Sequence, residues 1–272
     1  MIGQTSLLEK FNDIRKISGS NIILGPEGYG KNTLVNDIAS NLDIHIFRID
    51  NALSNELKEQ IYNYADVCFI VFDIDSKLQT KQIINIQNSI LKLLEEPPKT
   101  AKIFILAENN SYLLGTILNR CHIIYMESYS TEELRAIARE NNITNIDSYP
   151  DDKFKYISSP AEVLNLPTVE QLDNVEKLID TVFNSINRAN ISNTLSISKK
   201  INFKDDNELC DLDTFLRVFE IKLLNLIKNE YDAKYLEAFK VLNKLSSDIK
   251  GFNVNKVNLF ENFLLDLKNI LQ

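Results

Sequence analysis

The chain has 272 residues, a length typical of about two domains, and 44% of the residues are hydrophobic, which is enough for ample cores. Its net charge of −8 argues against a surface built wholly for nucleic acid, and two histidines with three widely spaced cysteines leave a zinc site without ligands. No apolar run reaches membrane-spanning length and no basic-then-apolar signal opens the sequence, so we expect a soluble, cytoplasmic protein with no membrane partner.

The first predicted elements are a helix over residues 2–17 and a short apolar strand over residues 21–24. A glycine-rich loop follows over residues 25–33, with the sequence Gly-Pro-Glu-Gly-Tyr-Gly-Lys-Asn-Thr, and it leads into a helical pattern. Strand, glycine loop and helix in this order form the context of a phosphate-binding P-loop, whose backbone N–H groups surround the phosphates. The alternative is a glycine turn that starts a helix and binds no ligand.

The loop predicts a set of nucleotide-binding residues, with the lysine reaching the β- and γ-phosphates. These residues are Gly25, Pro26, Gly28, Gly30, Lys31, Asn32 and Thr33. A P-loop normally has Ser or Thr directly after the lysine, where its hydroxyl binds Mg²⁺, and this chain has Asn32 there. Asn32 remains a candidate Mg²⁺ ligand through its amide oxygen, while Thr33 comes one place late.

Four further apolar runs predict strands, and they alternate with helical patterns. The runs are residues 44–49, 67–73, 102–107 and 122–126. The second run is almost continuously apolar, which is typical of a central strand buried on both faces. Residues 20–127 therefore predict an α/β fold with a parallel sheet and helices on both sides.

The second of these runs ends in Asp73, which we predict as an Mg²⁺ ligand, because a P-loop needs an acidic residue from a neighbouring strand. The next position, where a hydrolysing enzyme of this class has a water-polarising Glu, holds Ile74. Asp75 is a candidate substitute, but a solvated turn aspartate that starts the next helix is the better explanation of this residue.

The strand pattern ends near residue 127 and helical patterns follow. Three segments are predicted: an α/β nucleotide-binding core over 1–127, a small helical lid over 128–168 and an all-α domain over 169–272. In the last segment apolar residues recur at helical spacing, which predicts the core of a helical bundle.

Four stretches together resemble the AAA+ clamp-loader subunits of bacterial DNA polymerase III, in particular the delta-prime and gamma/tau group. They are the P-loop at 25–33, Ser-Ile-Leu-Lys-Leu-Leu-Glu-Glu-Pro-Pro at 89–98, Phe-Ile-Leu-Ala at 104–107 and Leu-Gly-Thr-Ile-Leu-Asn-Arg-Cys at 114–121. The resemblance covers about residues 1–168 and implies an AAA+ fold, in which the last segment would be a collar that holds subunits together.

The resemblance also implies roles for single residues. Arg120 stands where the family has the arginine of its Ser-Arg-Cys motif, which reaches the γ-phosphate bound by a neighbouring subunit. Asn109 stands at the family's polar sensor position. The alternatives are a surface arginine that ends a helix and an ordinary turn asparagine. Relatives that hydrolyse nucleotide have a second sensing arginine in the lid, and the corresponding residues 159–162 contain none.

Three functions are compatible with these residues. The first is a catalytically weak or inert subunit of a sliding-clamp loader that supplies Arg120 in trans. The second is an active ATP-hydrolysing subunit of the same loader, with Asn32 and Asp75 as substitutes, and the third is an unrelated P-loop enzyme. The loader readings imply ATP and Mg²⁺ as cofactors. Their implied partners are other loader subunits in a hetero- or homo-oligomeric ring, a sliding clamp, and primer-template DNA bound through the assembly.

Overall fold

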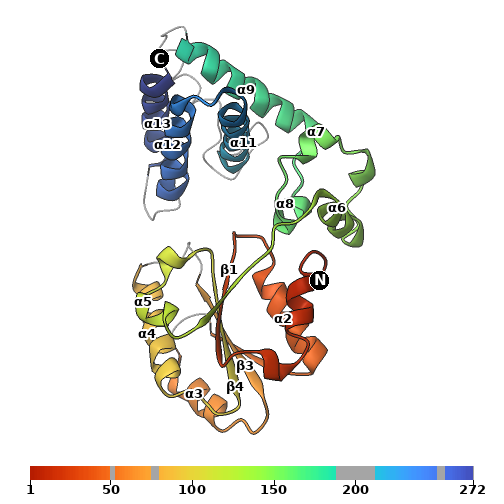
Figure 1. The fold of residues 1–272 in the computed structure, drawn as a ribbon, viewed down its shortest axis with the longest axis vertical. Coiled ribbons are helices and arrows are strands. Elements are labelled where there is room, and N and C mark those ends of the chain that lie inside the picture. Colours follow the sequence, from red (N-terminus) through yellow and green to blue (C-terminus); the bar gives the residue numbers. More distant parts are fainter. Residues whose placement is uncertain (50–52, 75–79, 188–211, 250–254, 272) are drawn as a thin grey trace. The chain divides into compact units, whose positions relative to one another are not determined.

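The computed structural model describes residues 1–49, 53–74, 80–187, 212–249 and 255–271 (Figure 1). Asp75 and Cys210 lie outside the described residues. The chain divides into two compact units. The first consists of Met1–Asp147 and Ser158–Asn165, and the second of Ser148–Ile157 and Leu166–Gln272.

The first unit is built on a five-stranded sheet in which all neighbouring strands are parallel, with the strand order β2-β3-β4-β1-β5. The strands are β1 (Ser20–Leu24), β2 (His45–Ile49), β3 (Cys68–Ile74), β4 (Ala101–Ala107) and β5 (His122–Tyr125). Each strand coincides with a predicted apolar run to within a residue or two. The prediction of an α/β fold with a parallel sheet is confirmed.

Helices cover both faces of this sheet, and alternate strand residues point into two separate cores. One face packs against α1 (Thr5–Lys10) and α2 (Lys31–Leu42) through residues such as Phe69 and Phe104. The other face packs against α3 (Asn55–Tyr62), α4 (Thr80–Glu95) and α5 (Gly115–Leu118). Burial on both faces explains why β3 and β4 read as continuous apolar runs instead of alternating ones.

The N-terminal segment differs from the single helix predicted over residues 2–17. It forms the short α1, a turn and a 3-10 helix over Ile14–Lys16. Asp13 causes the interruption, because its carboxylate accepts a hydrogen bond from the backbone N–H of Arg15 at 2.9 Å. A short polar side chain that bonds its own backbone in this way favours a helix start over a helix interior.

The segment predicted as a lid is shared between the two units. Its helices α6 (Thr131–Glu140) and α8 (Pro160–Leu164) belong to the first unit, whereas α7 (Asp151–Phe154) belongs to the second. Ser130 and Glu133 start α6 with a reciprocal capping box. The predicted division at residues 127/128 and 168/169 does not coincide with the edges of these units, and the three-domain division stays a prediction.

The second unit is helical throughout its described residues. After α7 it contains α9 (Val169–Asn187), α11 (Leu212–Glu230), α12 (Ala233–Ile249) and α13 (Lys256–Leu271). Their apolar stripes meet in one core around Phe219, whose ring stacks on Phe183 with centroids 5.4 Å apart.

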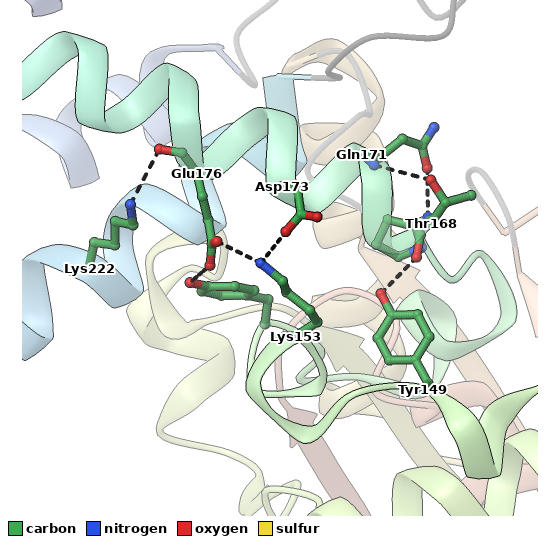
Figure 2. Close-up of polar contacts among 9 residues, drawn as sticks. Tyr149, Lys153, Thr168, Gln171, Asp173, Glu176 and Lys222 are labelled. Carbon is green, nitrogen blue, oxygen red and sulfur yellow. Dashed lines mark hydrogen bonds and ion pairs between the residues drawn. The ribbon is translucent and has the colours of Figure 1, made fainter.

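A polar network within the second unit joins α7 to α9 and α11 (Figure 2). The Lys153 ammonium, on a side chain only 9% exposed, contacts Asp173 at 2.5 Å and Glu176 at 2.6 Å. The other carboxylate oxygen of Glu176 accepts a hydrogen bond from the Tyr156 hydroxyl at 2.5 Å. Lys222 of α11 donates to the Glu176 carbonyl at 3.3 Å. These charge-assisted bonds fix the short α7 to a much longer helix.

Within the described residues, none of the helices is both long and apolar enough to cross a membrane. The thiols of Cys68 and Cys121 are free, the first buried and the second half-buried. Burial raises the pKa of Cys121 to about 11, which keeps that thiol protonated at neutral pH. The same described residues contain no group of three or more His, Cys, Asp or Glu arranged to hold a metal.

Candidate nucleotide site and trans arginine

The predicted P-loop residues, Asp73 and Asn109 all lie at the carboxyl edge of the sheet. The P-loop follows β1, Asp73 is the penultimate residue of β3, and Asn109 comes two residues after β4. The strands β3, β4 and β1 are neighbours and run parallel, so their carboxyl ends meet at one edge. Ligands of open α/β sheets bind at this edge.

The P-loop backbone depends on glycine at two positions. Gly28 has a φ of +79° and Gly30 a φ of +80°, a region that other residues rarely adopt. Gly30 is also the N-cap of α2, so the positive end of that helix dipole points at the loop. The Lys31 ammonium, half-buried beside the loop, donates to the carbonyls of Gly25 at 2.7 Å and Pro26 at 2.9 Å.

The loop is held from outside by residues of the lid segment. The Ala161 N–H of α8 donates to the Gly28 carbonyl at 3.3 Å, and a Cβ added to Gly28 would lie 2.6 Å from the Ala161 Cβ. The hydroxyl of Tyr129 donates to the Tyr29 carbonyl at 2.8 Å. Burial raises the pKa of Tyr129 to about 12, so this donor stays protonated.

Asn32 and Asp73, the two predicted metal ligands, contact each other directly. The contact is a direct hydrogen bond from the Asn32 amide nitrogen to Asp73 Oδ2 at 2.6 Å. The amide oxygen of Asn32 accepts from Arg48 Nη1, also at 2.6 Å. The other guanidinium nitrogen, Nη2, donates to Asn36 Oδ1 at 2.6 Å. Asn32 therefore links an arginine to an aspartate.

These groups fit the two parts of a metal–nucleotide complex differently. The positive-φ loop and the N-terminus of α2 fit a phosphate anion, which would be held by backbone N–H groups and Lys31. The donor set does not fit Mg²⁺, which demands oxygen ligands in near-ideal octahedral geometry. Between Asn32 and Asp73 the amide presents its NH₂ group, and its oxygen is turned towards Arg48.

The other residues considered at the carboxyl ends of the strands are Ile74, Thr33 and Asn109. Ile74 is 1% exposed and packs in the core, so the position after Asp73 presents only hydrocarbon. Thr33 is exposed on α2. Asn109 caps the 3-10 helix Asn110–Tyr112 and accepts from the Ser111 N–H at 2.9 Å, the arrangement of a turn asparagine. The catalytic, sensor and binding roles assigned to these positions stay predictions.

Arg120 lies at the amino ends of the strands, whereas the P-loop lies at their carboxyl ends. It precedes β5, and β5 is paired in parallel with β1 so that Asn21 lies beside His122 and Leu24 beside Tyr125. The P-loop leaves the far end of β1, a five-residue strand that spans roughly 16 Å. Arg120 therefore lies far from the P-loop of its own chain.

The Arg120 side chain is 44% exposed and weakly held. One guanidinium nitrogen donates to the Thr116 carbonyl at 3.4 Å, and the other lies 3.9 Å from a carboxylate oxygen of Glu95. An exposed ion pair at this distance is worth little. The side chain is thus free to exchange these partners for a stronger acceptor.

Arg48 is a residue of this edge that the sequence analysis did not select. Its only signal in the sequence is a charged side chain among the apolar residues of β2, the strand paired with β3. That signal is weak, because an arginine near a strand end is ordinary at a sheet edge.

Comparison with known proteins shows which families this chain resembles. Residues 9–130 match the family described as DNA polymerase III, delta subunit. DNA polymerase III subunit delta' of Buchnera aphidicola subsp. Schizaphis graminum is 24% identical over 185 residues, which are 59% of this chain. The match spans 55% of that relative, about half of its length.

Two solved structures from Thermotoga maritima show the extent of structural likeness. The RuvB Holliday junction branch migration motor is 16% identical with a TM-score of 0.46, over 85% of this chain and 77% of that one. A DNA polymerase III gamma subunit-related protein is 16% identical with a TM-score of 0.42, over 99% of this chain and 100% of that one. The resemblance read from the motifs is confirmed: residues 9–130, which contain the P-loop and Arg120, are similar to the DNA polymerase III delta-subunit family.

Proposed function

We propose that this chain is a subunit of a DNA sliding-clamp loader, that its own nucleotide site is catalytically weak or inert, and that it supplies Arg120 to the ATP site of a neighbouring subunit. One observation carries this proposal. Arg120 is exposed and weakly paired at the end of the strands opposite its own P-loop, and this supports contact of its guanidinium with a phosphate bound by another subunit.

The trans role follows from the chemistry of phosphoryl transfer. Charge builds up on the oxygens of the transferred phosphate, and an arginine supplied by a second molecule stabilises that charge. A guanidinium group is a strong partner for phosphate oxygens, and the weak contact of Arg120 with Glu95 costs little to break. A neighbouring subunit that presents its ATP to this edge would complete the site.

Weak hydrolysis by this chain is supported at three places. Asn32 replaces the hydroxyl residue of the P-loop, Ile74 occupies the place of the water-polarising acid, and the lid residues 159–162 contain no arginine to sense nucleotide. Loss of a general base alone commonly costs roughly 10²–10⁴-fold in rate. An ATP molecule in this site would be held and not efficiently cleaved.

The partners of this proposal are those of the family. We expect the chain to assemble with other clamp-loader subunits in a hetero- or homo-oligomeric ring, with the helices of residues 169–272 as the collar. The ring would bind a sliding clamp, and it would contact primer-template DNA through the assembled complex by backbone-directed positive groups. The family match and the relative named as a delta' subunit support these expectations.

An active ATPase subunit of the same loader is the second candidate. The retention of Lys31 beside the loop carbonyls and of Asp73 at the carboxyl edge favours it. Asp75, its predicted substitute for the missing acid, lies outside the described residues. An unrelated P-loop enzyme is not favoured, because it leaves the family match over residues 9–130 unexplained.

The test compares phosphate release by the reconstituted loader, with primed DNA and clamp, for the wild-type chain and for Arg120→Ala. We expect the variant to lower ATP hydrolysis of the complex by about tenfold or more, because a trans arginine is worth 10³–10⁵ in related chemistry. Arg139→Ala is the matched control, since Arg139 is a comparably exposed arginine that pairs with Asp147 on the same unit. A complex that keeps full activity with Arg120→Ala would rule out the trans arginine, and DNA-stimulated release by the isolated chain would favour the ATPase candidate.

A further inference from the structure

The orientation of the Asn32 amide is determined by two partners of opposite kind. Asp73 offers only acceptor oxygens, so the amide NH₂ must face it, and Arg48 offers only donors, so the amide oxygen must face the guanidinium. Turning the amide over would set oxygen against carboxylate and NH₂ against guanidinium. Both 2.6 Å bonds would then be lost.

A metal ion between Asn32 and Asp73 requires that reversed orientation. To bind Mg²⁺, the Asn32 oxygen must point at the same ion as the Asp73 carboxylate, because amide NH₂ groups do not coordinate it. The ion would also bring two positive charges close to a guanidinium that cannot lose its proton. The metal therefore has to displace Arg48 before it gains a second protein ligand.

Arg48 is held in this place by more than one bond. Its second guanidinium nitrogen donates to Asn36, one helical turn after Asn32 on α2. Its strand, β2, is paired with β3 so that Arg48 lies beside Val71, two residues before Asp73. The planar fork of arginine thus spans two amides on one helix while its backbone is fixed to the strand that carries Asp73.

We propose that Arg48 takes the place of the magnesium ion at this P-loop. Its guanidinium acts through the Asn32 amide to balance the Asp73 carboxylate, and this arrangement excludes a divalent cation from the site with or without a bound nucleotide phosphate. The inference goes beyond weak hydrolysis, because it assigns to one side chain the loss of metal dependence. It concerns this chain alone and does not depend on the trans role of Arg120.

The experiment measures equilibrium binding of a fluorescent ATP analogue to the purified full chain, once with Mg²⁺ and once with EDTA. We expect the wild-type chain to give the same signal in both buffers. In the double variant Asn32→Thr, Arg48→Ala, the hydroxyl of a standard P-loop is restored and the guanidinium is removed. This variant should bind the analogue about tenfold or more tightly with Mg²⁺ than with EDTA.

Two results would overturn the inference. One is a wild-type chain whose affinity rises about tenfold or more in Mg²⁺, and the other is a double variant that remains indifferent to Mg²⁺. Arg139→Ala serves as the control for loss of an exposed arginine. Circular dichroism confirms folding, and a second variant, Arg48→Met alone, keeps the test valid if the double variant unfolds, because an exposed side chain can be replaced at small cost to stability.

Discussion

Gly28 is the residue of the phosphate-binding loop with the least freedom to change. Its φ of +79° lies in the left-handed region, and its Cα faces Ala161 so closely that a methyl group would lie 2.6 Å from the Ala161 Cβ. A side chain at this position would therefore meet both backbone strain and a steric clash. The same glycine that allows the loop to curl also admits the N-terminus of α8 against the loop.

We expect Gly28→Ala to destabilise the first unit by about 2–5 kcal/mol, the sum of a left-handed alanine and an overpacked contact. Urea denaturation followed by circular dichroism measures the change. Gly19→Ala is the matched control, because Gly19 has no heavy atom within 4 Å of its added Cβ. The double variant Gly28→Ala, Ala161→Gly should recover part of the loss. Equal stability of Gly28→Ala and the Gly19 control would contradict the close approach of α8.

At the scale of elements, the four-residue α7 is too short to be stable alone and depends on its polar contacts with α9. Burial acts to raise the pKa of Glu176, but the hydrogen bonds from Lys153 and Tyr156 outweigh it, and the net pKa is lowered. Burial likewise acts to lower the pKa of Lys153, and its bonds to Asp173 and Glu176 raise it overall. Both shifts favour the charged pair.

The lowered pKa of Glu176 predicts acid sensitivity of the second unit. A carboxylate with a depressed folded pKa contributes stability that is present above its unfolded value, near 4.5, and is lost as the pH falls through the folded value. We expect the urea concentration at the unfolding midpoint of the wild-type chain to decrease as the pH is lowered below 4.5. Glu176→Gln should be less stable than the wild type at pH 7, and its urea midpoint should change less as the pH is lowered.

Glu170→Gln is the control for this prediction, since Glu170 is exposed on the same helix. It should leave both the midpoint at neutral pH and the acid dependence nearly unchanged. An acid transition of the same size in the wild type and in Glu176→Gln would show that the network around Lys153 does not couple α7 to α9.

At the scale of the whole molecule, the two units have separate hydrophobic cores. Phe104 is fully buried between the sheet and α2, and Phe219 is fully buried among the helices of the second unit. The backbone passes between the units in the region of residues 147–166, where α7 and α8 belong to different units. Cores that share few residues unfold with limited cooperativity.

We expect calorimetry of the full chain to show two transitions. Phe104→Ala should lower the midpoint temperature of one transition and Phe219→Ala that of the other. Each variant should reduce the free energy of unfolding of its own unit by about 3–5 kcal/mol. The two variants control for each other, because they delete the same side chain from different cores. A single transition lowered equally by both would mean that the units unfold together.

The sequence by itself determined the strands of the first unit and the identity of its loop. Apolar runs such as residues 68–74 specify buried strands, and Gly28, Gly30 and Lys31 specify the P-loop, because periodicity and backbone preference are local properties. The motifs around residues 89–98 and 114–121 were enough to reveal the resemblance to the clamp-loader subunits. Asn32 and Asp73 were each predicted from the sequence as Mg²⁺ ligands, and those roles stay predictions, while the contact between the two side chains is seen only in the structure.

Only the tertiary structure decided what surrounds these residues. The bond between Asn32 and Arg48 depends on the register of β2 against β3, which no local pattern encodes. The position of Arg120 opposite the P-loop depends on β5 pairing with β1. The assignment of α7 and α8 to different units depends on which core each short helix reaches. Contacts between distant residues are set by packing and pairing of whole elements, and a sequence pattern reports only the element itself.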